Sequence, residues 1–119
     1  MKKHYARIAV IGEMPPFAKD DITKHLGVPN GRIDLPLKDE VDAVVIISDG
    51  LAVQKALAEA AFSKGVPVFL YVLPAEGARG NNFPNTHKCG ERTKSGAYIL
   101  KVGNNWTDIG DGTVALMPC

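Results

Sequence analysis

Residues 42–72 read DAVVIISDGLAVQKALAEAAFSKGVPVFLYV, and this stretch decides the fold. The runs at 42–48 and 66–72 are apolar and rich in β-branched residues, which predicts two strands buried on both faces of a sheet. Between them, apolar side chains recur at helical spacing and predict an amphipathic helix over about 51–64. A strand, a helix and a second strand in this order predict a βαβ unit with parallel strands.

The turn between the first of these strands and the helix carries Ser48, Asp49 and Gly50. Either Ser48 or Asp49 is expected to cap the start of the helix, and Gly65 is expected to end it. Open parallel sheets bind ligands outside the carboxyl ends of their strands, which is where this turn lies. The turn is therefore a candidate ligand contact as well as a candidate helix cap.

A further parallel strand is expected near the N-terminus, where residues 6–12 read ARIAVIG. The two prolines of the following segment, 14–17, are expected to forbid a helix there and to leave a loop over the strand's carboxyl end. Asp20 can then cap a short helix over 21–26, and Gly27 suits the position just after its last turn. This first crossover is expected to be irregular.

The remaining segments predict an edge, a loop and a meander. Residues 31–37 alternate in polarity, but Pro36 restricts them to an edge strand or an extended loop. Residues 76–95 are rich in glycine, asparagine and charge, which predicts a long binding loop, lid or disordered segment. After this loop we expect three short antiparallel strands and two turns, with strands at 96–102, 106–109 and 113–117 and turns at 103–105 and 110–112.

Together these patterns predict an α/β fold, a small Rossmann-like (flavodoxin-like) parallel sheet of about three core strands with a C-terminal antiparallel β meander. The expected units are the α/β part at 1–75, the basic loop at 76–95 and the meander at 96–119. The meander is too small for a core of its own, so it either packs on the α/β part or extends its sheet. A three-stranded sheet leaves its edges uncovered, which makes a homo-oligomer one expected arrangement.

The composition is that of a globular chain without a membrane span. The 119 residues are 45% hydrophobic and 23% charged, with a net charge of +1. No apolar run approaches the roughly 20 residues that cross a bilayer, and no secretory cleavage pattern is recognised, so we expect a cytoplasmic protein. The small net charge gives no pull toward nucleic acid or an anionic membrane, and neither is an expected partner.

Glu13 and Asp49 are the first candidate catalytic residues. Glu13 follows Gly12 at the end of the first predicted strand, and Met14 begins the loop beyond it. If the two carboxylates lie on one edge of the sheet, one can act as nucleophile and the other as acid, or both can orient a sugar hydroxyl. The alternative for Glu13 is a solvated loop acid. The spaced glycines of a dinucleotide-binding turn are missing here, which disfavours NAD, and we expect no cofactor.

Positive charge gathers in the loop at 76–95, where Arg79 and Arg92, with two lysines, are candidate phosphate contacts. The alternative is an ordinary solvated loop. His87, Cys89 and Cys119 are possible metal ligands, but no CxxC pair accompanies them, so a partial metal site, a disulfide and two unrelated thiols stay open.

Tyr98 and Trp106 are the large aromatic residues of the predicted meander. Either they stack on a nucleobase or they form the core of the meander.

A resemblance to a known superfamily rests on three short motifs, namely Asp42-Ala43-Val44-Val45, Glu59 and Gly65-Val66-Pro67-Val68. In these motifs residues 1–75 resemble the Rossmann-like superfamily of nucleoside 2-deoxyribosyltransferases and LOG-type nucleotide-binding proteins. The resemblance implies a nucleotide-type ligand and makes Glu59 the match to the family's helical glutamate, and thus a third catalytic candidate. The alternative for Glu59 is a surface ion pair with Lys55 one turn earlier.

Three functions follow from these observations. The first is binding of a nucleoside or nucleotide at the carboxyl edge of the sheet, with cleavage or transfer at the N-glycosidic bond by a carboxylate. The contacts expected there are Gly12, Met14, Ser48, Gly50, Arg79 and Arg92. The second is a non-catalytic protein that sequesters or senses a nucleotide. The third is a protein-interaction module with a vestigial crevice.

Overall fold

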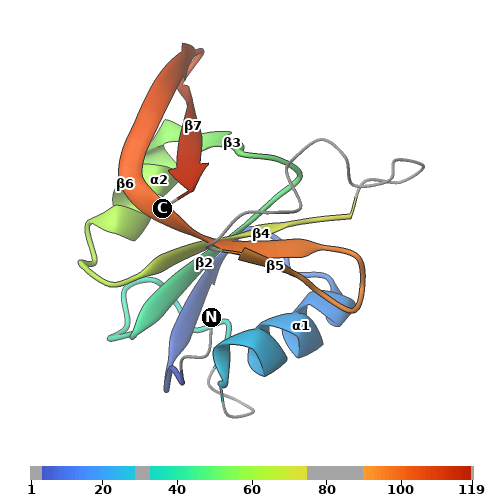
Figure 1. Ribbon diagram of the computed structural model, residues 1–119. Helices are drawn as coiled ribbons and strands as arrows, with labels where there is room; N and C mark the ends of the chain where they lie inside the picture. Colours follow the sequence, from blue (N-terminus) through green and yellow to red (C-terminus); the bar gives the residue numbers. More distant parts are fainter. Residues whose placement is uncertain (1–3, 29–32, 75–89, 119) are drawn as a thin grey trace.

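A computed structural model of the chain describes residues 4–28, 33–74 and 90–118 (Figure 1). Within these residues the chain forms two helices, α1 (Pro16–Leu26) and α2 (Lys55–Phe62). The same residues form seven strands, β1 (Ile8–Ile11), β2 (Ala43–Ser48), β3 (Ala52–Gln54), β4 (Val68–Val72), β5 (Gly90–Arg92), β6 (Tyr98–Gly110) and β7 (Thr113–Pro118). Neither of these two helices is long and apolar enough to cross a membrane.

All seven strands belong to one mixed sheet. Its order is β1-β2-β4-β6-β7-β3, and β5 pairs with β6 beside this path. β1, β2 and β4 are parallel, which confirms the strands expected at 6–12, 42–48 and 66–72. β6 then pairs antiparallel with β4, so the C-terminal hairpin extends the sheet. The α/β class is confirmed, and the parallel strands are one part of a larger, strand-rich mixed sheet.

The two faces of the sheet are covered differently (Figure 1). On one face, Ile22 and Leu26 of α1 pack with Val45 and Phe69 of the parallel strands. On the other face, α2 and the bent β6–β7–β3 part of the sheet enclose a second core with the alternate side chains of β2 and β4. β2 and β4 are apolar on both faces for this reason, as expected for strands in the middle of a sheet.

α1 begins earlier than the prolines suggest. Pro15 is its N-cap and Pro16 its first residue, so the loop expected at 14–17 ends at Pro15, and the expected cap at Asp20 is wrong. A proline is tolerated in the first turn because its missing N–H would have had no partner there. Gly27 ends the helix in the left-handed conformation, as expected.

α2 begins later than the apolar pattern suggests. Residues 52–54, expected to be helical, form β3, which pairs with β7. The first N–H of the helix, that of Lys55, donates to the carbonyl of Gly112 at the tip of the β6–β7 hairpin, at 2.7 Å. Pairing with a distant strand therefore overrides the local helical pattern, and the predicted cap at Ser48 or Asp49 is wrong.

β6 is a single strand of 13 residues, so the predicted turn at 103–105 is wrong. Those residues lie within an irregularity of the β6–β7 register between Val102 and Trp106, where the strand bends. The turn expected at 110–112 is confirmed. β5 occupies part of the predicted loop at 76–95, and Leu35 makes an isolated parallel bridge to Ala9, in keeping with the edge expected at 31–37.

Replacing Gly90 by alanine is expected to destabilise the protein. A methyl carbon on Gly90 would lie 2.6 Å from Leu100 Cβ and 2.9 Å from the carbonyl oxygen of Ile99, so β5 must shift away from β6. We expect Gly90→Ala to lower the free energy of unfolding by about 1–3 kcal/mol, measured by urea denaturation. Gly50→Ala is the matched control, because no atom lies within 4 Å of its added methyl. Equal effects of the two substitutions would contradict the close β5–β6 contact.

Candidate functional site

The carboxyl ends of β1 and β2 bring the predicted residues to one edge of the sheet. Gly12 follows β1 with a φ of 103°, and a Cβ there would lie 3.2 Å from both Cβ and the carbonyl oxygen of Ile47. Glycine is therefore required for the chain to pass so close to β2. Glu13 follows it and is exposed, whereas Met14 is partly buried against the core under α1.

The turn after β2 is held by its own serine. Ser48 Oγ accepts a hydrogen bond from the Gly50 N–H and donates one to the carbonyl of Ala52, each at 3.2 Å. Asp49 is exposed and caps no helix, since α2 begins at Lys55. Within the described residues, neither Asp49 nor Glu13 has a hydrogen bond or an ion pair.

The strand register places the two carboxylates near the same level. Ile11, the last residue of β1, pairs with Ile46 of β2, and Glu13 and Asp49 lie two and three residues beyond this pair. Neighbouring strands lie about 4.8 Å apart, so the two residues follow adjacent strands at one edge of the sheet. The sequence-based expectation that Glu13 and Asp49 share an edge therefore agrees with the pairing of β1 and β2.

The turn between β5 and β6 borders the same edge. Val72, the last residue of β4, pairs with Tyr98, and a methyl on Gly96 would lie 3.7 Å from Pro74 Cβ. Arg92 is engaged locally, because its guanidinium carbon lies 5.7 Å from the ring centroid of Tyr98 and its Nη1 donates to the Gly96 carbonyl at 3.3 Å. The backbone of the turn at 93–97 therefore lies beside the carboxyl edge, whereas the Arg92 side chain is held against the hairpin itself.

A buried polar cluster that the sequence analysis missed lies under this edge. Asp21, in the middle of α1, is only 6% exposed, and its Oδ2 accepts hydrogen bonds from Tyr71 (2.6 Å) and Ser95 (2.5 Å). Thr93 Oγ1 lies 3.1 Å from Ser95 Oγ. Asp21 stands on the buried stripe of α1 with Ala18 and Ile22, so a carboxylate at helical spacing among apolar residues was the available signal.

The cluster stabilises the charged form of Asp21. Burial by itself raises the pKa of this carboxyl, but hydrogen bonds from Ser95 and Tyr71, with Thr93 and His25 nearby, bring the pKa below its ordinary value. Burial and the contact with Asp21 raise the pKa of the Tyr71 hydroxyl. Asp21 therefore stays ionised and accepts hydrogen bonds near neutral pH, which makes it an anchor and a poor general base.

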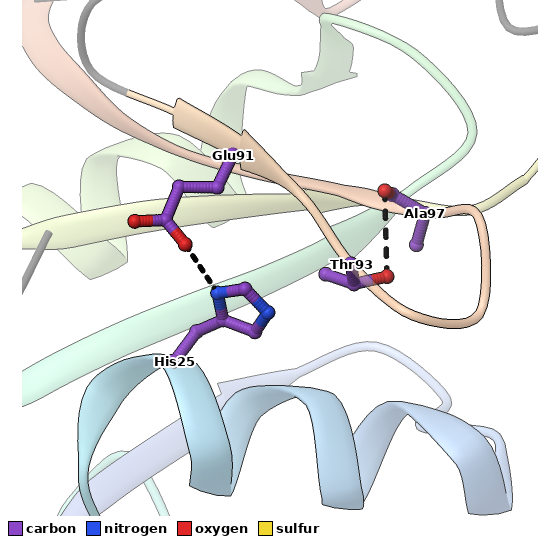
Figure 2. Close-up of polar contacts among 4 residues, drawn as sticks. All are labelled: His25, Glu91, Thr93 and Ala97. Atoms are coloured by element: carbon purple, nitrogen blue, oxygen red, sulfur yellow. Dashed lines mark hydrogen bonds and ion pairs between the residues drawn. The ribbon is translucent and has the colours of Figure 1, made fainter.

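A second contact lies one helical turn further along α1. Figure 2 shows His25 pointing from α1 to Glu91 on β5, with Nδ1 2.5 Å from Oε1. The same view shows the hydroxyl of Thr93 donating to the carbonyl of Ala97 across the turn, at 3.4 Å. The His25–Glu91 contact joins elements that are 66 residues apart and so follows from no local pattern, whereas the Thr93–Ala97 contact is local to the turn.

The other candidates are distributed over the fold. Glu59 is exposed on α2. Its expected partner Lys55 instead pairs with Asp108 of β6, with Nζ 3.7 Å from Oδ2. Trp106 packs on Phe62 of α2 with ring centroids 5.3 Å apart, and Tyr98 is buried, so both aromatic residues serve the core.

Some of the predicted residues cannot be placed on the fold. Four of these residues, Arg79, His87, Cys89 and Cys119, lie outside the described residues. Among the residues that the structure does describe, no three histidine, cysteine, aspartate or glutamate side chains are grouped to hold a metal ion. Comparison with family models, curated proteins and solved structures finds no match to this chain.

Removing the Asp49 side chain is expected to leave stability almost unchanged. An N-cap aspartate typically contributes about 0.5–2 kcal/mol. Since Asp49 is exposed and lies outside α2, we expect Asp49→Ala to change the free energy of unfolding by less than about 0.5 kcal/mol. Urea denaturation and far-ultraviolet circular dichroism measure this. A loss of helix signal together with a large loss of stability would indicate that Asp49 does cap α2.

Asp21 is expected to make folding sensitive to acid. Its folded-state pKa is lowered, so the stability that it contributes is present above the ordinary aspartate pKa of about 3.9 and is lost as pH falls through the lower folded value. We expect Asp21→Asn to be less stable than the wild type at neutral pH and to lose less stability on acidification below pH about 4. Asp20→Asn, an exposed neighbour, should keep the wild-type pH profile. Parallel profiles for the wild type and Asp21→Asn would contradict this role.

Proposed function

We propose that this protein binds a nucleoside, or a small molecule with similar hydroxyl groups, at the carboxyl edge of β1 and β2. The observation that carries the proposal is the placement of Glu13 and Asp49, two exposed carboxylates after neighbouring parallel strands. Their oxygens have no partner among the described residues and are free to accept hydrogen bonds from a ligand. A carboxylate that accepts from sugar hydroxyls makes a charge-assisted hydrogen bond, which is stronger than a neutral one.

The charge of the edge favours a nucleoside over a nucleotide. Two carboxylates repel a phosphate group, and the first N–H of α2, that of Lys55, is already engaged because it donates to the Gly112 carbonyl. Arg92, a predicted phosphate contact, stacks on Tyr98 on the hairpin. The resemblance to nucleoside 2-deoxyribosyltransferases, which have a Rossmann-like parallel sheet, favours a ligand that carries a nucleobase as well as hydroxyl groups.

The same pair of carboxylates supports a second candidate function, cleavage of an N-glycosidic bond. One carboxylate would attack the anomeric carbon, a C–O bond would form as the C–N bond breaks, and the electron pair would leave with the base. The second carboxylic acid would protonate the base, and water would then release the sugar from the enzyme. Glu59, exposed on α2, is the alternative nucleophile that the resemblance implies.

Ligand binding tests the first proposal. We expect ribonucleosides and 2′-deoxyribonucleosides at about 1 mM to raise the melting temperature, and their 5′-monophosphates to raise it less. Titration calorimetry should show that Glu13→Gln and Asp49→Asn each weaken nucleoside binding roughly tenfold or more, because each removes a charged acceptor. Asp20→Asn is the control for charge alone and should bind as the wild type does.

Two results would decide against this site. One is tighter binding of the monophosphates than of the nucleosides, and the other is unchanged nucleoside affinity in the Glu13→Gln/Asp49→Asn double variant. Chromatography of the same incubations separates binding from catalysis, since release of a free nucleobase requires cleavage. Turnover that persists in the double variant would exclude both residues as the nucleophile.

A further inference from the structure

α1 is joined to the β5–β6 hairpin and β4 at two points that lie one helical turn apart. At the first point, Asp21 Oδ2 accepts hydrogen bonds from Ser95 of the hairpin turn and from Tyr71 of β4. At the second point, His25 contacts Glu91 of β5. Residues four apart share one face of a helix, so a single side of α1 carries both contacts.

The β5 arm of the hairpin has little backbone pairing to hold it in place, whereas β6 is paired with β4. β5 is three residues long, and among the described strands it pairs with β6 alone. The turn is closed by the Thr93 N–H to the Ala97 carbonyl at 2.9 Å and by the Gly96 N–H to the Thr93 carbonyl at 3.1 Å. Side-chain contacts with α1 therefore add to the few backbone hydrogen bonds that hold β5 and the turn at 93–97.

We propose that α1 and the β5–β6 hairpin form an electrostatic clasp, in which the ionised Asp21 keeps the turn at 93–97 closed against the sheet. Neutralising this carboxylate releases the turn while the parallel strands stay folded. The reason is that Ser95 and Tyr71 both donate to the same oxygen of Asp21, and a neutral group is a much weaker acceptor for these two hydroxyls.

The groups that face Asp21 come from each element packed around it, and they are Tyr71 from β4, Thr93 and Ser95 from the turn, and His25 from α1 itself. Glu91 joins this set through His25. Arg92 belongs to the opposite face, because it pairs with Tyr98, whose side chain lies in the core away from α1. Asp21 is thus the anion that accepts the hydrogen bonds of the clasp.

The clasp bears on the carboxyl edge because the turn lies beside it. Gly96 approaches Pro74, just beyond β4, and Ser95 precedes it. Release of the turn removes this neighbour from the edge where Glu13 and Asp49 lie, so ligand binding there should weaken. This consequence rests on the proposed function, whereas the clasp itself does not.

Amide hydrogen exchange of the full chain, followed by NMR, tests the clasp. In Asp21→Asn we expect the amides of Thr93 and Gly96 to exchange roughly tenfold faster or more than in the wild type. The Val44 amide, which donates to the Pro67 carbonyl at 3.0 Å in the β2–β4 region, should keep its protection. Asp20→Asn removes a charge from the exposed side of the same helix and should change neither set.

A second variant keeps the test informative if Asp21→Asn folds poorly. Ser95→Ala removes one donor from the turn and should accelerate the same amides. Adding Asp21→Asn to Ser95→Ala should then increase exchange less than the sum of the two single effects, since both remove one contact. Faster exchange of turn and core amides alike, or turn amides that keep wild-type protection in both variants, would overturn the clasp.

Nucleoside titration of Asp21→Asn separates the clasp from the proposed function. If the wild type binds no nucleoside, the proposed function fails, and the exchange of Thr93 and Gly96 still decides the clasp. If the wild type binds and Asp21→Asn binds equally well with its turn released, the link between the clasp and the carboxyl edge is overturned.

Discussion

The burial of β4 is the constraint on which the rest of the structure depends. All five of its residues are buried, and it pairs on one side with β2 and on the other with β6. A strand in this position has no access to water, so any polar side chain on it needs a partner from the protein. Tyr71 is that side chain, and Asp21 supplies the partner. A buried carboxylate needs more than one donor, and Ser95 provides the second. One tyrosine in an apolar strand thus accounts for a contact among α1, the sheet and the hairpin.

Much of the parallel part of the sheet follows from the sequence, because its strands are apolar on both faces and that pattern is local. The boundaries of the helices do not follow as well. Residues 52–54 carry a helical pattern, but they pair with β7, more than fifty residues later in the sequence. The start of α2 then depends on the carbonyl of Gly112, which no local rule for helix caps identifies. The predicted start of α1 is too late because its two prolines suggest that no helix forms there. Proline breaks the interior of a helix but suits its first turn.

The candidate site likewise contains one part that a local sequence pattern predicts and one part that depends on distant contacts. Glu13 and Asp49 could be assigned to one edge from the sequence, because each follows a strand and the carboxyl ends of parallel strands meet at one edge. The Asp21 cluster could not be assembled in this way, since Ser95 is 74 residues from Asp21 and lies in a segment whose composition predicts a loop. Its separate signals were present, an aspartate on an apolar helix stripe and a tyrosine in a buried strand. Only the antiparallel pairing of β4 and β6 brings the turn to them.

The carboxylates of Asp21, Glu13 and Asp49 therefore fall into two groups that differ in burial and in hydrogen-bond partners. Asp21 is buried and its Oδ2 accepts hydrogen bonds from two hydroxyl groups of the protein, so its charge stabilises the fold. Glu13 and Asp49 are exposed, and neither side chain makes a hydrogen bond or an ion pair with the described part of the chain. Exposed carboxylates without a structural partner keep their oxygens free to accept new hydrogen bonds. This difference is the reason for proposing ligand binding at the edge rather than at the buried cluster beneath it.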